Sequence, residues 1–278
     1  MYKIGLSSCG RLIEEKDFIE YQESGINAIE VSVGLDHCNN IDFKRLLELS
    51  KKYEIDLWSF HLPFSPFSKL EISEKELADG TVAYFGELIQ KASDVGIDKF
   101  VVHPSGEPIG AENRAERMKV SKESLFELAK IARRNGAVIA VEVLPRTCLG
   151  NCSDEILELI SVDSALKVCF DTNHLLGEDQ IEFIRKVGNK ITTLHVSDYD
   201  FVNERHWLPG EGKTNWNAVY KALNEVGYNG AWLYEVGFGS TKTITRERDL
   251  NCKDFVINAN EIFEGRQLTV VPHQKLLL

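Results

Sequence analysis

The stretch that decides the fold is residues 121–143, SKESLFELAKIARRNGAVIAVEV. Its first part, residues 121–135, has apolar side chains at helical spacing, and Gly136 follows as a typical helix stop. Residues 138–143 then form a short apolar run that contains a single charged residue, Glu142. The stretch therefore predicts one amphipathic helix followed by one buried strand, which is the repeating unit of an α/β sheet.

The same alternation runs through nearly all of the 278 residues. The predicted strands are short β-branched or aromatic runs at Lys3–Ser7, Ala28–Val33, Asp56–His61, Phe100–His103, Val138–Val143, Lys167–Asp171, Thr192–Val196 and Ala231–Val236. Helices are predicted between them at Glu14–Gln22, Phe43–Tyr53, Val82–Val95, Ser121–Asn135, Ile156–Ile160, Asn217–Val226 and Lys253–Phe263. This pattern predicts an α/β fold, a single (β/α)8 TIM barrel domain over residues 1–278, with a doubly wound open sheet as the alternative.

The charge balance and the cysteines restrict the partners and the compartment. Lys plus Arg number 32 and Asp plus Glu number 43, so the formal net charge is −11. Nucleic-acid binding needs clustered cations, so no nucleic-acid partner is expected. No apolar run approaches the roughly 20 residues that span a bilayer, so no membrane association is expected either. With no signal peptide and six scattered cysteines, the chain is predicted to be cytoplasmic with reduced thiols. The apolar tail Leu268–Leu278 leaves open whether it packs on its own barrel or joins a homo-oligomer interface.

Four consecutive predicted strands end in residues that bind metals, namely Glu142, Asp171, His195 and Glu235. Functional groups of such a barrel lie at the C-terminal ends of its strands, so we expect these four side chains to meet near one axis. Three carboxylates and an imidazole would repel one another there unless a cation lay between them. We therefore predict one divalent metal. The oxygen-rich donor set favours Mn²⁺, with Mg²⁺, Co²⁺ or Zn²⁺ as alternatives.

Histidines are concentrated in the same segments. Four of the seven, His61, His103, His174 and His195, lie at predicted strand ends, and His206 follows the seventh strand. A lone histidine near a strand end is more often a hydrogen-bonded structural residue than a ligand. Their shared position is therefore more informative than any one of them.

Several motifs together make the chain resemble a known family. They are CFDTNH at residues 169–174, LHVSD at 194–198, RHWLPGEG at 205–212 and the pair Tyr234-Glu235. With these motifs the chain resembles the sugar isomerase/epimerase superfamily of xylose-isomerase-like TIM barrels, which also includes endonuclease IV. The resemblance extends strand by strand over essentially the whole chain. It implies that Glu142, Asp171, His195 and Glu235 are the shared metal ligands.

The resemblance implies two alternative chemistries, and the first is sugar isomerisation or epimerisation. Ketose epimerases of this type use one metal, and the residues matching Glu142 and Glu235 act as acid and base on opposite faces of the sugar, through an enediolate. The chain would then be an isomerase for a small sugar or sugar phosphate, with an inosose dehydratase-like lyase as a further alternative. The residues expected to contact such a substrate are His61, His103, His174, Arg205, His206 and Trp207.

The second chemistry is DNA repair by a three-zinc phosphodiesterase. Endonuclease IV has nine ligands, and this sequence has a candidate at each, with Glu204 where that enzyme has Asp: His61, His103, Glu142, Asp171, His174, His195, Glu204, His206 and Glu235. The negative net charge and the lack of basic runs near the strand ends oppose binding to a duplex, so we favour the sugar chemistry. The segment Pro63–Leu70 also lacks the cationic, wedge-bearing character that kinks DNA.

The sequence leaves two smaller questions open. The loop Gly237–Lys242 after the eighth predicted strand is either a phosphate subsite or a plain flexible loop. Glu30, in the second predicted strand, points either into the barrel or toward a helix.

Overall fold

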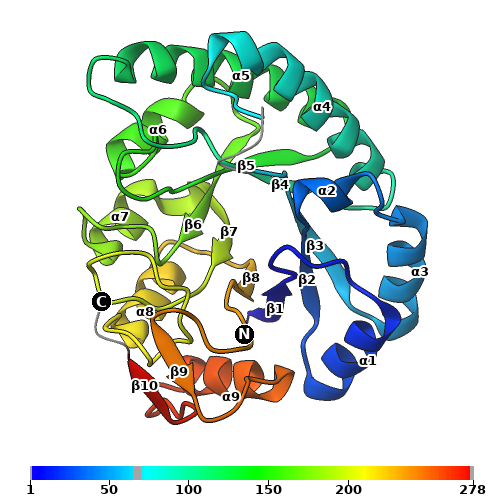
Figure 1. Cartoon of the computed structure of the whole chain (residues 1–278), viewed down its shortest axis with the longest axis vertical. Helices are drawn as coiled ribbons and strands as arrows, with labels where there is room; N and C mark the ends of the chain where they lie inside the picture. Colours follow the sequence, from blue (N-terminus) through cyan, green and yellow to red (C-terminus); the bar gives the residue numbers. More distant parts are fainter. Residues whose placement is uncertain (1, 65–69, 276–278) are drawn as a thin grey trace.

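The chain forms a ring of eight parallel strands with helices outside it (Figure 1). The computed structural model describes residues 2–64 and 70–275. The barrel strands are β1 (Lys3–Ser7), β2 (Ala28–Ser32), β3 (Asp56–His61), β4 (Lys99–Val102), β5 (Val138–Glu142), β6 (Leu166–Asp171), β7 (Ile191–His195) and β8 (Ala231–Tyr234). They neighbour one another in chain order from β1 to β7, and β8 pairs with β1.

The edge between β7 and β8 joins the two ends of the sheet. The Val196 N–H donates to the Leu233 carbonyl over 2.8 Å, and the Glu235 N–H donates to the Val196 carbonyl over 3.1 Å. These two bonds bridge the last gap, so the strands form a nearly closed barrel. The predicted (β/α)8 barrel is confirmed, and the open sheet is wrong for this chain.

The helices follow the predicted alternation with two additions. Their bounds are α1 (Glu15–Ser24), α2 (Leu35–Cys38), α3 (Phe43–Tyr53), α4 (Lys75–Ser93), α5 (Arg114–Arg134), α6 (Ser153–Ile160), α7 (Gln180–Val187), α8 (Trp216–Glu225) and α9 (Cys252–Phe263), with a 3₁₀ turn at Gly188–Lys190. The short helices α2 and α7 were not predicted. In α7 the Asp179 carboxylate accepts hydrogen bonds from the backbone N–H groups of Ile181 and Glu182. An aspartate at this N-cap position is a sequence signal for the start of a helix.

The apolar core lies mainly between the strands and the helices, and a polar set is buried inside the barrel. Phe60, Phe100 and Trp232 are fully buried; Phe60 packs against Phe43 of α3, and Trp232 packs against Trp216 of α8. At the carboxyl ends of the strands the buried side chains become polar and charged. Burying such groups is costly unless each has a partner, so their convergence requires a chemical explanation.

A small antiparallel pair lies outside the barrel, formed by β9 (Ile244–Arg246) and β10 (His273–Lys275). It covers a fully buried ion pair, in which the Arg246 guanidinium donates to Glu211 over 2.9 and 2.8 Å. Leu268 and Val270 lie against the loop at Gly210. The described part of the tail therefore packs on its own barrel, and residues 276–278 lie outside the described residues.

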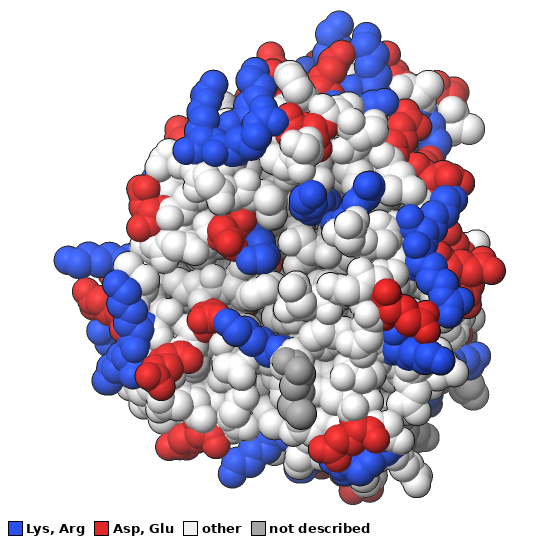
Figure 2. Space-filling view, turned by 180° about the vertical axis from the view of Figure 1, so that it is seen from behind, with Lys and Arg blue, Asp and Glu red and all other residues white. Residues whose placement is uncertain are grey.

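The outer surface carries charges of both signs. Figure 2 shows Lys and Arg side chains interspersed with Asp and Glu around the edge of the face turned away from the viewer in Figure 1. Within the described residues, no helix has both the length and the apolar character needed to cross a membrane. All six cysteines are unpaired.

Candidate metal centre

Four side chains converge where β5, β6, β7 and β8 end, and they are the four predicted ligands. One ligand atom from each of Glu142, Asp171, His195 and Glu235 lies within 4.8 Å of the others. The sheet register produces this convergence, because Glu142 pairs with Cys169, and Asp171 two residues later pairs with His195. We call these four residues the inner cluster. All are buried except Glu235, whose side chain is 16% exposed.

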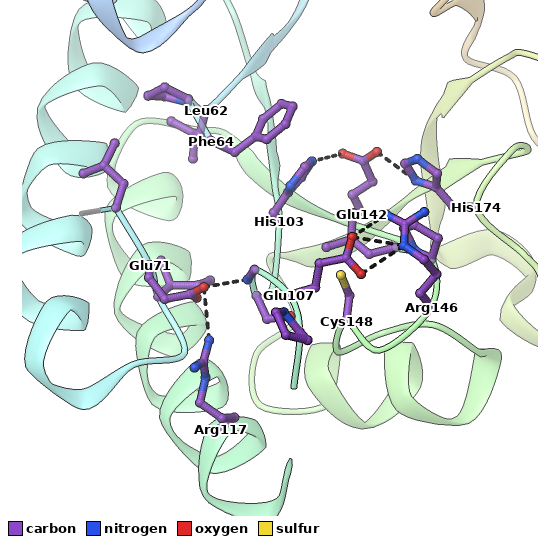
Figure 3. A pocket seen from close by; sticks show the side chains of 18 of the residues that line it. Leu62, Phe64, Glu71, His103, Glu107, Arg117, Glu142, Arg146, Cys148 and His174 are labelled. Atoms are coloured by element: carbon purple, nitrogen blue, oxygen red, sulfur yellow. Dashed lines mark hydrogen bonds and ion pairs between the residues drawn. The ribbon is translucent and has the colours of Figure 1, made fainter. Parts of the chain in front are cut away.

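Two further clusters adjoin the inner one, and each also has its ligand atoms within 4.8 Å of one another. The first contains His61, His103 and Glu142. The Glu142 Oε2 atom lies 3.0 Å from His61 Nε2 and 3.1 Å from His103 Nε2, while its Oε1 lies 3.3 Å from His195 Nδ1. Glu142 is therefore shared between this cluster and the inner one. Figure 3 shows His103 and His174 pointing at Glu142 from opposite sides.

The second, which we call the outer cluster, contains His174, Glu204 and His206. His174 Nε2 lies 3.3 Å from Glu204 Oε2. The structure thus brings together all nine residues that the resemblance to endonuclease IV had indicated.

The histidines of these clusters are placed between acceptors on both sides. His61 Nδ1 donates to the Leu62 carbonyl over 2.8 Å while its Nε2 faces Glu142. His174 Nδ1 donates to the Val143 carbonyl over 2.9 Å while its Nε2 faces Glu204. A neutral imidazole has only one N–H, so each of these two rings needs either a second proton or a metal ion on its carboxylate side.

The inner cluster also has unmatched acceptor atoms. Asp171 Oδ2 and Glu235 Oε2 are buried and accept no hydrogen bond from the described residues. The nearest imidazole nitrogens, on His174 and His195 respectively, are 3.4 Å away. Burial raises the pKa of Asp171 to about 7. Burial lowers the pKa of His174, but Asp171 and Glu204 outweigh that effect and raise it to about 10. The buried carboxylates therefore favour a positive charge between them, and the donor set fits a divalent cation there.

Glu30 lies behind the inner cluster, and its side chain points into the barrel. The His195 Nε2–H donates to Glu30 over 3.1 Å, and the Ser59 hydroxyl donates to Glu30 over 2.8 Å. The side chain is fully buried. This answers one of the two open questions from the sequence.

A cavity of about 470 Å³ opens onto the clusters. Glu142, His103, His174, His206 and Glu235 line its floor. Figure 3 shows its outer wall, which contains two ion pairs, Glu71–Arg117 and Glu107–Arg146. An adjoining hollow of about 330 Å³ shares Glu235 and His206 and is also lined by His61.

Two of the predicted substrate contacts lie elsewhere. Arg205 and Trp207 are not among the described residues that line either hollow. The Arg205 guanidinium pairs with Asp200 over 2.9 Å. Trp207 is 3% exposed and donates its indole N–H to the Thr243 hydroxyl over 3.0 Å. The backbone bonds between Asp198 and Trp207 hold this indole in the core.

Arg146 is a cavity residue that the sequence analysis did not single out. Its Nη2 atom lies 3.1 Å from Glu204 Oε1, and its Nη1 donates to Asn203 over 2.7 Å. Its φ is +53°, a backbone conformation that side-chain-bearing residues rarely adopt. Its position in the loop directly after Glu142 is the signal that could have identified it.

The loop Gly237–Lys242 has a structural role in this fold. Arg246 donates to the carbonyls of Gly237 and Gly239, and the Ser240 hydroxyl accepts from the Arg246 N–H over 3.0 Å. The Thr241 N–H, a donor that a phosphate subsite could use, donates instead to the Ile244 carbonyl over 2.8 Å, so these bonds favour the loop as a structural element.

Comparisons with known proteins agree with this geometry. An uncharacterized protein of Methanocaldococcus jannaschii is 29% identical over 240 residues, 82% of this chain and 81% of the relative. A D-psicose 3-epimerase of Ruminiclostridium cellulolyticum is 35% identical over 121 residues, 41% of this chain and 40% of that enzyme. The crystal structure of a D-tagatose 3-epimerase-like protein superposes with a TM-score of 0.78 at 26% identity, covering 95% of this chain and 96% of that one.

The two relatives above whose names give an activity are named as an epimerase and an epimerase-like protein, and epimerases are isomerases, which agrees with the prediction of an isomerase. A family model described as the xylose isomerase-like TIM barrel matches residues 18–249. The predicted family resemblance is confirmed, and the chain belongs to the xylose isomerase-like TIM barrel family.

Proposed function

We propose that this chain is a ketose epimerase or isomerase that depends on one divalent metal, with Mn²⁺ as the favoured ion, and acts on a small carbohydrate. One observation carries the proposal. Glu142 and Glu235 both belong to the inner cluster and both line the cavity, so two carboxylates face the same reacting space. The named activities of the D-psicose 3-epimerase and the D-tagatose 3-epimerase-like relative support the sugar class.

The inner cluster provides the ligands for the metal. When bound, a divalent ion polarises a ketone and its neighbouring hydroxyl and acidifies the C–H bond between them. Glu235 is suited to take up that proton, because its buried Oε2 accepts no hydrogen bond from the described residues. Glu142 is suited to return a proton from the other side, because His61 and His103 both contact its Oε2 and can resupply it. His174 and His206, on the cavity floor, are placed to orient hydroxyl groups.

Isotope exchange tests the mechanism. The protein is incubated with candidate ketoses and Mn²⁺ in deuterated water, and deuterium is expected at the reacting carbon of the product. Glu142→Gln and Glu235→Gln should abolish the labelling, whereas Glu158→Gln, a change on the outside of α6, should not. Turnover without deuterium incorporation would contradict the proton-transfer mechanism and indicate a hydride shift.

A second candidate function is a three-metal phosphodiesterase, and the three adjoining clusters favour it. Metal analysis separates the two candidates. The epimerase proposal expects one tightly held divalent ion per chain. Three zinc ions per chain, together with cleavage of a duplex at an abasic site, would establish the phosphodiesterase instead.

A further inference from the structure

We infer that Glu30 is a positioning residue of the metal centre, which acts by holding the His195 ring so that its Nδ1 atom faces the inner cluster. The inference rests on the metal dependence proposed above. It concerns a residue that belongs to none of the three ligand clusters.

The contact crosses the interior of the barrel. Glu30 lies in β2 and His195 at the end of β7, and both side chains are completely buried. Both carboxylate oxygens of Glu30 lie 3.1 Å from His195 Nε2. Ser59 in β3 fixes the carboxylate by donating its hydroxyl over 2.8 Å. Within the described residues, no Lys or Arg forms an ion pair with Glu30, and the His195 ring is the titratable group that contacts it there.

This contact determines which nitrogen of the His195 ring remains available to bind a metal. An ionised carboxylate only accepts hydrogen bonds, so the ring hydrogen that faces Glu30 is on Nε2. The Nδ1 atom is then the nitrogen left to bind a metal, through the lone pair that its proton gives up, and it lies 3.3 Å from Glu142 Oε1 and 3.4 Å from Glu235 Oε2. Partners of this kind behind a ligating histidine fix its tautomer and orientation, and losing one typically lowers metal affinity by about 10–100-fold.

Stability alone is a poor explanation for a carboxylate at this position. An apolar side chain in β2 would avoid the cost of burying a charge inside the barrel. The buried Glu211–Arg246 pair provides the contrast. It joins the segments that follow β7 and β8, and neither of its members belongs to a ligand cluster. Glu30 instead contacts a side chain whose other nitrogen belongs to the inner cluster. Glu211 is therefore a matched control for a buried carboxylate of ordinary structural role.

The test measures Mn²⁺ binding by the electron paramagnetic resonance signal of free Mn²⁺, in the full-length protein and three variants. Glu30→Leu is expected to raise the Kd for Mn²⁺ about 10–100-fold. Glu30→Gln should raise it less, because the amide oxygen still accepts from the Nε2–H. Glu211→Gln should lower the melting temperature and leave the Kd within about twofold, because distant sites act independently.

A second readout needs no metal. Nitrogen-15 NMR of the metal-free protein reports which ring nitrogens of His195 carry hydrogen. In the wild type Nε2 should carry a hydrogen whose signal is shifted by the bond to Glu30, and Glu30→Leu should lose that shift.

Each outcome decides the question. A folded Glu30→Leu protein with the wild-type Kd and the wild-type NMR pattern would overturn the role of Glu30 and leave the metal centre intact. If Glu30→Leu fails to fold, Glu30→Ala, which also removes the acceptor for the Nε2–H, takes its place, and wild-type values in both readouts would overturn the role in the same way. A wild-type protein that binds no divalent metal would refute the metal centre itself, and with it this role.

Discussion

The inner and outer clusters are built from different parts of the barrel. The inner cluster comes from the ends of four adjacent strands, whose hydrogen-bonded register fixes the spacing of its members. The outer cluster takes Glu204 and His206 from the loop after β7, where their side chains are 33% and 37% exposed. Contacts such as that between Arg146 and Glu204 hold this loop. The sheet therefore fixes the inner cluster, whereas the outer cluster depends on loop contacts, and loops are the more mobile and more variable parts of a barrel.

The largest expected effect comes from removing a carboxylate of the inner cluster. Glu235→Gln should lower kcat by about 10²–10⁴-fold, the range in which general acid–base groups contribute. Steady-state turnover of a ketose at saturating Mn²⁺ measures it. A loss below tenfold would show that Glu235 is not one of the acid–base groups.

The second-largest effect is expected on thermal stability, when the metal is removed. A ligand present at 100 times its Kd stabilises the folded state by about 2.7 kcal/mol, so chelation should lower the Tm of the Mn²⁺-loaded protein by several degrees. Differential scanning calorimetry with and without chelator measures the shift. Asp171→Asn should lose that shift because it removes an inner ligand, and an unchanged shift in this variant would place the stabilising ion elsewhere.

A change in the outer cluster should have a smaller effect and distinguish the two candidate functions. Under the epimerase proposal, Glu204→Gln should leave metal stoichiometry unchanged and reduce kcat/KM by less than about tenfold, equivalent to about 1.4 kcal/mol. Elemental analysis beside kinetics measures both. Loss of one of several metal ions per chain in this variant would favour the three-metal enzyme.

The smallest effect is expected from Arg146→Gln. Its guanidinium touches Glu107 as well as Glu204, with side chains about one-third exposed, and exposed pairs of this kind contribute about 1 kcal/mol or less. We expect a rise in KM of a few-fold with kcat unchanged. A large fall in kcat would instead show that Arg146 assists the reaction itself.

The strand ends were predictable because their residues follow apolar runs, as Glu142 follows Ile139–Val141. The contacts made across the barrel were not. Glu30 and His195 are far apart in sequence, and only barrel closure reveals that they touch. Trp207 was expected at the substrate because it lies in a loop, but the Asp198–Trp207 backbone pairing draws it into the core. The segment Pro63–Leu70, predicted to lack a DNA-kinking character, lies largely outside the described residues.

The antiparallel pair of β9 and β10 has a consequence for how the chain can be shortened. A chain ending at Gly265 would keep every barrel strand and every inner-cluster ligand. It would also remove Leu268, which lies against the loop at Gly210, and the whole of β10, in which His273 lies beside Arg246 and 3.6 Å from Glu211. Water would then reach a charge pair that joins the loops after β7 and β8. The useful C-terminal boundary for expression and engineering therefore lies beyond Lys275, even though the barrel itself finishes with α9.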